Sequence, residues 1–169
     1  LGYPGGPLIE KLAMKGEVNA FKLPHPLEFK RNLNFSFSGI KTAVNLLIKK
    51  QKKINNEIKQ NISASFQNKI IEILIKKLEL ALDLLKKQNY NINDISIVGG
   101  VAANNNIKES LKKLSQSNNC RLIFPPLELC GDNAVMIANV CLQHYKLKKK
   151  PNINFIPDSR ITLTQKKLL

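Results

Sequence analysis

Long apolar runs are missing from this sequence. No stretch approaches the roughly 20 consecutive apolar residues that a membrane span needs. The N-terminal LGYPGGPLIEK also lacks a basic segment followed by an apolar one, which a signal peptide would show. We therefore expect a soluble, cytoplasmic protein without a membrane partner. The first residue is a leucine within a turn-rich run rather than a methionine, so we also expect the sequence to be part of a longer chain.

Cysteine and histidine are scarce. Cys120, Cys130 and Cys141 are widely spaced and form no Cys-x-x-Cys pair, which favours free thiols over disulfides or a zinc knuckle. Of the two histidines, His25 lies between prolines and His144 lies in a basic helical stretch. No Ser, His and Asp arrangement, Cys and His pair or paired carboxylates at helical spacing can be found, so we predict no catalytic residue in this chain.

Acidic residues are few relative to basic ones. Against 27 Lys and Arg stand 12 Asp and Glu, and the net charge is +15. Such an excess favours a polyanionic partner such as RNA. Abundant Lys, Asn and Ile are also typical of coding bias in an AT-rich genome, so the charge by itself leaves both explanations open. With 169 residues, 43% of them hydrophobic, the chain is long enough for one domain with a buried core.

The hydrophobic periodicity predicts a helix-rich α/β fold. The first 40 residues are rich in Pro, Gly and Asn and should be mostly loop. Ser38 is expected to cap the second helix, and the longest helix has apolar residues every three or four positions. The expected elements are helices over 7–16, 39–50, 60–88, 103–116 and 131–146, and strands over 95–98 and 121–124.

The two strands and the helix between them predict a short parallel βαβ unit. Two strands cannot form a covered parallel sheet, so further strands are expected either in the N-terminal loop or upstream of Leu1. We expect three parts: a helical and loop segment over 1–92, a βαβα nucleotide-binding core over 93–147 and a basic tail over 148–169.

Gly99 and Gly100 lie where the first strand should end and a helix should begin. In parallel α/β sheets this edge binds ligands, and the N–H groups at a helix start favour anions. Glycine would let a phosphate or ribose approach the backbone, although a tight packing turn would also explain the pair. Asn104, Asn105 and Asn106 could each cap the helix, and for Asn105 and Asn106 we prefer that role.

Two further segments carry candidate polar groups. Asp132 stands at the start of the last helix and could be its N-cap or a carboxylate ligand of a metal. A metal would need further ligands from elsewhere, because one carboxylate does not make a metal site. Gly5 and Gly6 form a flexible elbow before Pro7, and Glu10 is expected to be a first-turn acid of the first helix.

Four motifs follow one another in the order YPGGP, NFSFSGIKT, VGGVAANN and PPLELCGDNAVMIA. From Tyr3 to about Tyr145 this succession resembles the C-terminal half of the universal tRNA threonylcarbamoyladenosine synthesis transferase family, in its bacterial form. The resemblance implies one lobe of an actin-like fold, related to sugar kinases and heat-shock ATPases, with a nucleotide bound between two lobes. It also implies transfer of a threonylcarbamoyl group from threonylcarbamoyl-adenylate to the exocyclic amine of the adenosine 3′ of the anticodon, in tRNAs reading codons that begin with A.

The resemblance also implies roles for particular residues. Asp132 matches the carboxylate ligand of a divalent metal, iron or zinc, whose paired histidine ligands belong to the N-terminal half. Some members carry an aspartate at the position of Glu10. The residues expected to bind or flank the adenylate are Gly6, Glu10, Gly99, Gly100 and Asn104.

The implied partners are tRNA, a paralogous subunit of the same fold and a small P-loop ATPase. Because the histidines and the first phosphate-binding strands are not in this sequence, we expect the chain alone to be inactive as a transferase. The alternatives are another kinase or chaperone-like ATPase of the same fold, or a non-catalytic, basic RNA-binding remnant.

Overall fold

A computed structural model describes residues 1–26 and 33–150. Its contacts divide the chain into two compact units, Leu1–Gly131 and Asp132–Leu169. Most of the expected basic tail lies outside the described residues, and the three-part division stays a prediction.

In order, the elements are α1 (Gly5–Ala13), α2 (Ser38–Lys50), α3 (Asn56–Lys87), β1 (Asp94–Ser96), a 3-10 helix (Gly100–Ala103), α4 (Asn105–Ser117), β2 (Arg121–Ile123), a 3-10 helix (Leu127–Leu129) and α5 (Ala134–Lys146).

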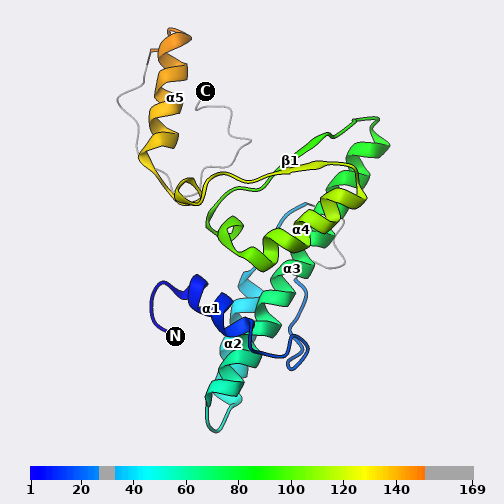
Figure 1. Cartoon of the computed structure of the whole chain (residues 1–169), viewed down its shortest axis with the longest axis vertical. Coiled ribbons are helices and arrows are strands. Elements are labelled where there is room, and N and C mark those ends of the chain that lie inside the picture. The colour runs from blue at the N-terminus through cyan, green and yellow to red at the C-terminus, as the bar shows by residue number, and fades with distance from the viewer. Residues whose placement is uncertain (27–32, 151–169) are drawn as a thin grey trace. The chain divides into compact units, whose positions relative to one another are not determined.

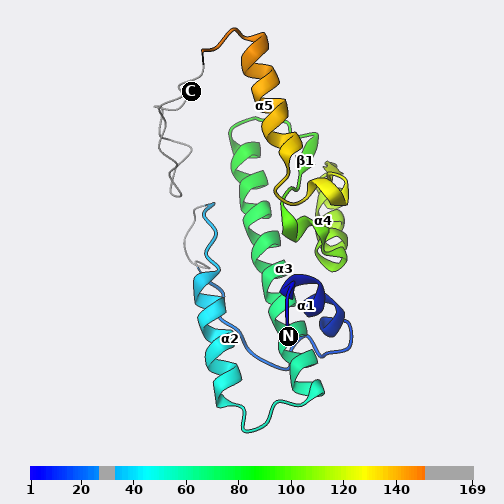
Figure 2. The same ribbon diagram turned by 90° about the vertical axis from the view of Figure 1, so that its left-hand side faces the viewer.

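The long helix α3 organises the first unit. Helices α1, α2 and α4 all pack against it, and Figure 2 shows α2 on one side of α3 with α1 and α4 on the other. Helix α3 is therefore the common packing partner of three helices. None of the helices that the structure describes has the length and apolar character of a membrane span.

The segment that follows α1, residues 16–21, lies in close contact with α3, and this contact fixes the position of α1 (Figure 1). A Cβ at Gly16 would lie 2.1 Å from the backbone oxygen of Gln60, so only glycine permits this approach. Just beyond it, the Glu17 N–H donates to Asn61 Oδ1 at 2.9 Å, and the Phe21 N–H donates to Ser65 Oγ at 3.1 Å. These contacts hold the N-terminal segment along α3 even though much of it is loop.

The α/β prediction is confirmed, since β1 and β2 form a two-stranded parallel sheet with α4 between them in the chain. Asp94 pairs with Arg121 at the start of the register. A core cluster of Ile71, Ile107 and Leu111 joins α3 to α4 beside this sheet.

Two expectations about the strands were wrong. The first strand is shorter than 95–98 and not fully buried: Val98 is 71% exposed, because β1 pairs with β2 alone among the described residues. The N-terminal loop also hides no strand within 1–26 or 33–40, where the described structure is helix, turn and loop. The alternative, strands upstream of Leu1, stays a prediction.

Helix starts also differ from expectation. Helix α1 begins at Gly5 rather than residue 7, and α3 begins earlier than residue 60 because Asn55 Oδ1 accepts the Ile58 N–H at 2.8 Å. Ser38 is not a cap: it is the first residue of α2, and Phe37 at the N-cap position makes no side-chain cap bond. Asn, Ser and Asp cap with similar strength, so the sequence does not distinguish Asn55 from Asn56 as the cap of α3.

Candidate substrate site

A cavity of about 490 Å³ lies among α1, α3, the start of α4 and the segment around Phe35 and Phe37. Most of its lining is apolar, and Glu10, Lys41 and Gln67 add polar groups. The volume and this mixture are typical of sites for small organic ligands.

Four of the predicted substrate residues line this one cavity: Gly6, Glu10, Gly100 and Asn104. Gly6 and Glu10 are about 90 residues away from Gly100 and Asn104 in the sequence. The packing of α1 and α4 on α3 brings the two pairs together. Gly99 is the neighbour of this lining. Segments from three of the four sequence motifs, those containing Gly6, Phe37 and Gly100, therefore meet at the cavity.

The glycine pair is not explained by close packing. Among the described residues, a Cβ at either Gly99 or Gly100 would have no heavy atom within 4 Å, so close packing does not account for the pair and a turn conformation is the remaining structural explanation. Gly99 has a φ of +91°, which other residues adopt only with strain. Gly99 is thus required by the turn, whereas Gly100 leaves space open at the edge of the cavity.

Glu10 has a different local role from the one expected. It lies beyond the first turn of α1, because that helix starts at Gly5. Its Oε1 instead accepts the backbone N–H of Asn105 at 2.8 Å. The carboxylate therefore lies at the N-terminus of α4, where the helix dipole favours negative charge, and it ties α1 to α4.

Asn104 is the N-cap of α4. Its Oδ1 accepts the Ile107 N–H at 3.0 Å, and its Nδ2 donates to Gln67 Oε1 at 2.8 Å. Asn105 and Asn106 are the first two residues of the helix, so they lie at its start as expected, but the N-cap itself is Asn104. The cap position falls to Asn104 because the preceding 3-10 helix, Gly100–Ala103, ends directly before it.

Sequence reasoning missed several residues that line the cavity, among them a buried polar residue, two aromatic residues and a lysine. Gln67 is polar but only 5% exposed, and it interrupts the apolar stripe of α3, a signal that could have marked it. Phe35 and Phe37 stack with ring centroids 5.8 Å apart and an angle of 10° between the rings. Together with Lys41 they belong to the motif NFSFSGIKT, from which no site residue was predicted.

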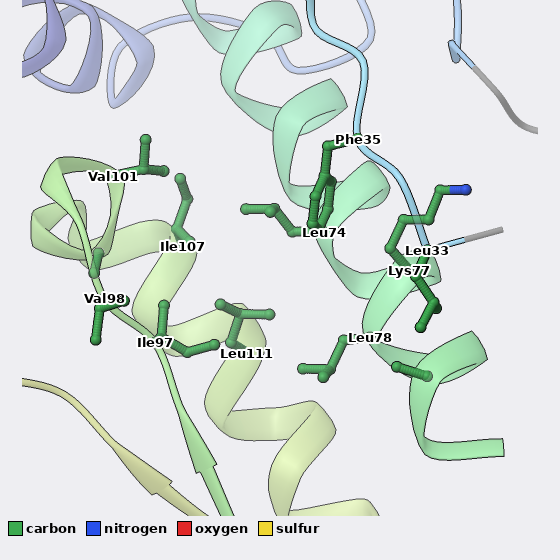
Figure 3. Close-up of a pocket in the computed structure, with 12 residues that line it drawn as sticks. Leu33, Phe35, Leu74, Lys77, Leu78, Ile97, Val98, Val101, Ile107 and Leu111 are labelled. Carbon is green, nitrogen blue, oxygen red and sulfur yellow. The ribbon is translucent and has the colours of Figure 1, made fainter. Parts of the chain in front are cut away.

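A neighbouring cavity of about 320 Å³ has a different character (Figure 3). Leu74 and Leu78 of α3 lie opposite Val101, Ile107 and Leu111. Among the described residues that line it, Lys77 alone carries a charge. This second cavity therefore offers few groups for a polar ligand, and the larger cavity is the better candidate site.

Asp132 belongs to the second unit and is exposed. It is not the N-cap of α5, because Asn133 Oδ1 accepts the Met136 N–H at 3.1 Å instead. Within residues 1–26 and 33–150, no group of three or more His, Cys, Asp and Glu side chains could hold a metal ion. The described residues therefore do not make a complete metal site around Asp132.

Comparison with known proteins identifies the family. Residues 1–139 match the family model described as TsaD, tRNA N6-adenosine threonylcarbamoyltransferase. Proteins of that name from Thermosipho africanus and Pelagibacter ubique are 47% and 49% identical to this chain, over 89% and 87% of its length and 43% and 41% of theirs.

A third relative of the same name, from Rickettsia massiliae, is 44% identical over 96% of this chain and 48% of its own length. The chain thus spans less than half the length of these curated relatives. On the strength of the family match, which covers most of the sequence, the chain belongs to the tRNA N6-adenosine threonylcarbamoyltransferase family.

Proposed function

We propose that this chain supplies the adenylate-binding side of an enzyme that transfers a threonylcarbamoyl group to tRNA. The observation that carries the proposal is the convergence of Gly6, Glu10, Gly100 and Asn104 on one cavity. Family membership supports the reaction, because the relatives are named for it. The acceptor is the adenosine 3′ of the anticodon in tRNAs reading A-starting codons, and the protein acts in the cytoplasm, where these tRNAs are.

The reaction requires little covalent chemistry from the protein. The donor, threonylcarbamoyl-adenylate, is a mixed anhydride. The exocyclic amine of the adenosine attacks its carbamoyl carbon, the new C–N bond forms, the C–O bond to phosphate breaks, and AMP leaves with its electron pair. The amine loses one proton. Orientation and charge stabilisation are then the main tasks of the protein, and neither needs a nucleophilic side chain.

The cavity residues suit the binding part of this task. The apolar lining and the stacked rings of Phe35 and Phe37 suit the flat face of a nucleobase. Lys41 supplies a cation for an acidic group of the ligand, and Glu10 supplies a hydrogen-bond acceptor. Gly100 leaves room for close approach of the ligand to the backbone.

We also propose Asp132 as one ligand of a divalent metal, iron or zinc. The described residues do not complete such a site, so its other ligands must come from outside them. In the full-length protein, Asp132→Ala should lower the metal bound per chain, and unchanged metal content would contradict this assignment.

The enzyme would work with a paralogous subunit of the same actin-like fold and with a small P-loop ATPase. The actin-like lobe and both partners rest on the family resemblance. Co-purification of the full-length protein with each partner would test them, and failure of both to bind would contradict this part of the proposal.

The decisive experiment supplies the full-length protein and its partners with tRNA and threonylcarbamoyl-adenylate, and measures threonylcarbamoyladenosine in the digested tRNA by mass spectrometry. We expect product with the wild type and up to about tenfold less with Asn104→Ala, since one lost hydrogen bond in a binding site has this magnitude. Glu57→Ala, an exposed acid at the start of α3, is the control.

We expect no product from the purified chain 1–169 alone. ATP hydrolysis by the full-length protein alone, without product on tRNA, would support an ATPase instead.

A further inference from the structure

The amide orientations of Asn104 and Gln67 follow from one backbone group. The Ile107 N–H can only donate, so the Asn104 atom that meets it at 3.0 Å must be the oxygen. The other end of that carboxamide, Nδ2, is then a donor. Its partner on Gln67, 2.8 Å away, must therefore be the acceptor Oε1.

These two hydrogen bonds leave one N–H donor of Asn104 for a ligand. Nδ2 of Asn104 has two N–H groups, and one of them is used by Gln67. Among the described residues the second has no protein acceptor, and Asn104 lines the cavity. A ligand that meets Asn104 here must offer an acceptor oxygen or nitrogen.

Gln67 is buried on α3 and lines the same cavity. Without its oxygen, the Asn104 side chain would keep the bond to Ile107 but lose the partner that fixes the plane of its amide group. We propose that Gln67 is a positioning residue, which holds the Asn104 carboxamide so that its second N–H meets an acceptor of the adenylate. This inference rests on the proposed function.

Two substitutions at the same position separate positioning from simple packing. Gln67→Leu introduces an apolar side chain of similar size and removes the acceptor oxygen. Gln67→Glu keeps an acceptor oxygen, at the cost of placing an ionisable group in a buried position. If Gln67 only packs, Gln67→Leu should be tolerated at least as well as Gln67→Glu. If it positions Asn104, the order for ligand binding is reversed.

The experiment measures kcat and KM for threonylcarbamoyl-adenylate in the full-length protein, with thermal unfolding recorded for each variant. We expect Gln67→Leu to raise KM about tenfold, and Gln67→Glu to stay within about threefold of the wild type despite lower thermal stability. A KM for Gln67→Leu equal to that of the wild type, or an equal rise in both variants, would overturn the inference.

A second variant keeps the test valid if Gln67→Leu does not fold. Asn104→Asp retains the oxygen that accepts the Ile107 N–H but removes the donor, so it should raise KM by a similar factor. Combining it with Gln67→Glu should bring no recovery, because the donor itself is lost. A wild-type KM in Asn104→Asp contradicts both the inference and the proposed contact of Asn104 with the adenylate, whereas a wild-type KM in Gln67→Leu contradicts the inference alone. A wild-type protein without turnover overturns the proposed function.

Discussion

Asn104 and Asn55 begin their helices with the same hydrogen bond. In each, the side-chain Oδ1 accepts the N–H of the residue three positions later, at 3.0 Å for Asn104 and 2.8 Å for Asn55. Only Asn104 also lines the cavity and donates to Gln67. The two residues therefore allow helix capping to be separated from ligand binding by matched substitutions.

We expect Asn55→Ala to lower the free energy of unfolding by about 1 kcal/mol, the usual cost of losing an N-cap, and Asn104→Ala to lower it further, because that substitution also leaves the buried Gln67 oxygen without its donor. Only Asn104→Ala should also raise KM for the adenylate, by about tenfold, because only it removes a donor from the site. Urea unfolding and steady-state kinetics measure the two effects. Equal kinetic effects of the two substitutions would mean that Asn104 acts only through the helix.

The ion pair between Asp94 and Arg121 joins the first residues of the two strands. Arg121 donates from Nε to Asp94 Oδ1 at 2.7 Å and from a terminal nitrogen to Oδ2 at 3.1 Å. These hydrogen bonds, helped by the guanidinium charge, hold the pKa of Asp94 below its usual value. The pair therefore stabilises the fold above the unfolded-state pKa, and its contribution is lost as pH falls through the lower folded-state pKa.

Arg121→Gln should raise the pKa of Asp94 back toward its usual value. An NMR pH titration of the Asp94 carboxyl carbon measures this shift, with Lys112→Gln as a control that removes an exposed cation on α4. We expect little change in stability at neutral pH, because both partners are exposed to solvent. An Asp94 pKa that does not move in Arg121→Gln would show that this contact does not persist in solution.

At the scale of elements, the contact of Gly16 with α3 decides where α1 lies. Gly16→Ala should lower the free energy of unfolding by about 1–3 kcal/mol, since the new Cβ would meet the Gln60 backbone rather than a flexible side chain. Gly39→Ala is the matched control: its Cβ would be 3.5 Å from Pro26 Cγ, which is ordinary contact. Equal unfolding free energies for the two variants in urea would contradict this role of Gly16.

The elements themselves could be predicted to different degrees. Helices α3 and α4 have apolar residues at helical spacing, and their existence followed from periodicity. Their first residues did not, because Asn55 and Asn104 compete with chemically similar neighbours for the cap position. The end of β1 could not be predicted either, since the burial of Val98 depends on which strands and helices lie beside it.

At the scale of the whole molecule, the net charge of +15 leads to a test of tRNA contact. If lysines bind phosphates, the affinity of the full-length protein for tRNA should fall at least about tenfold between 50 and 200 mM salt, because binding releases counterions. Replacing Lys49, Lys50, Lys52 and Lys53 by glutamine should flatten this dependence if they contact tRNA. Fluorescence anisotropy measures the affinity and its salt dependence for each protein. An affinity independent of salt would indicate that the lysines reflect the coding bias of an AT-rich genome and do not bind tRNA.

The sequence alone determined the helix-rich α/β class, the family and four of the residues now placed at the cavity. Periodicity is local, and the motifs are contiguous, so neither requires knowledge of distant contacts. The tertiary structure decided that Gly6 and Glu10 meet Gly100 and Asn104 in one cavity, and that Gln67 holds the Asn104 amide. These relations depend on how α1 and α4 pack against α3, and such packing between distant segments has no signature in the spacing of residues along the chain.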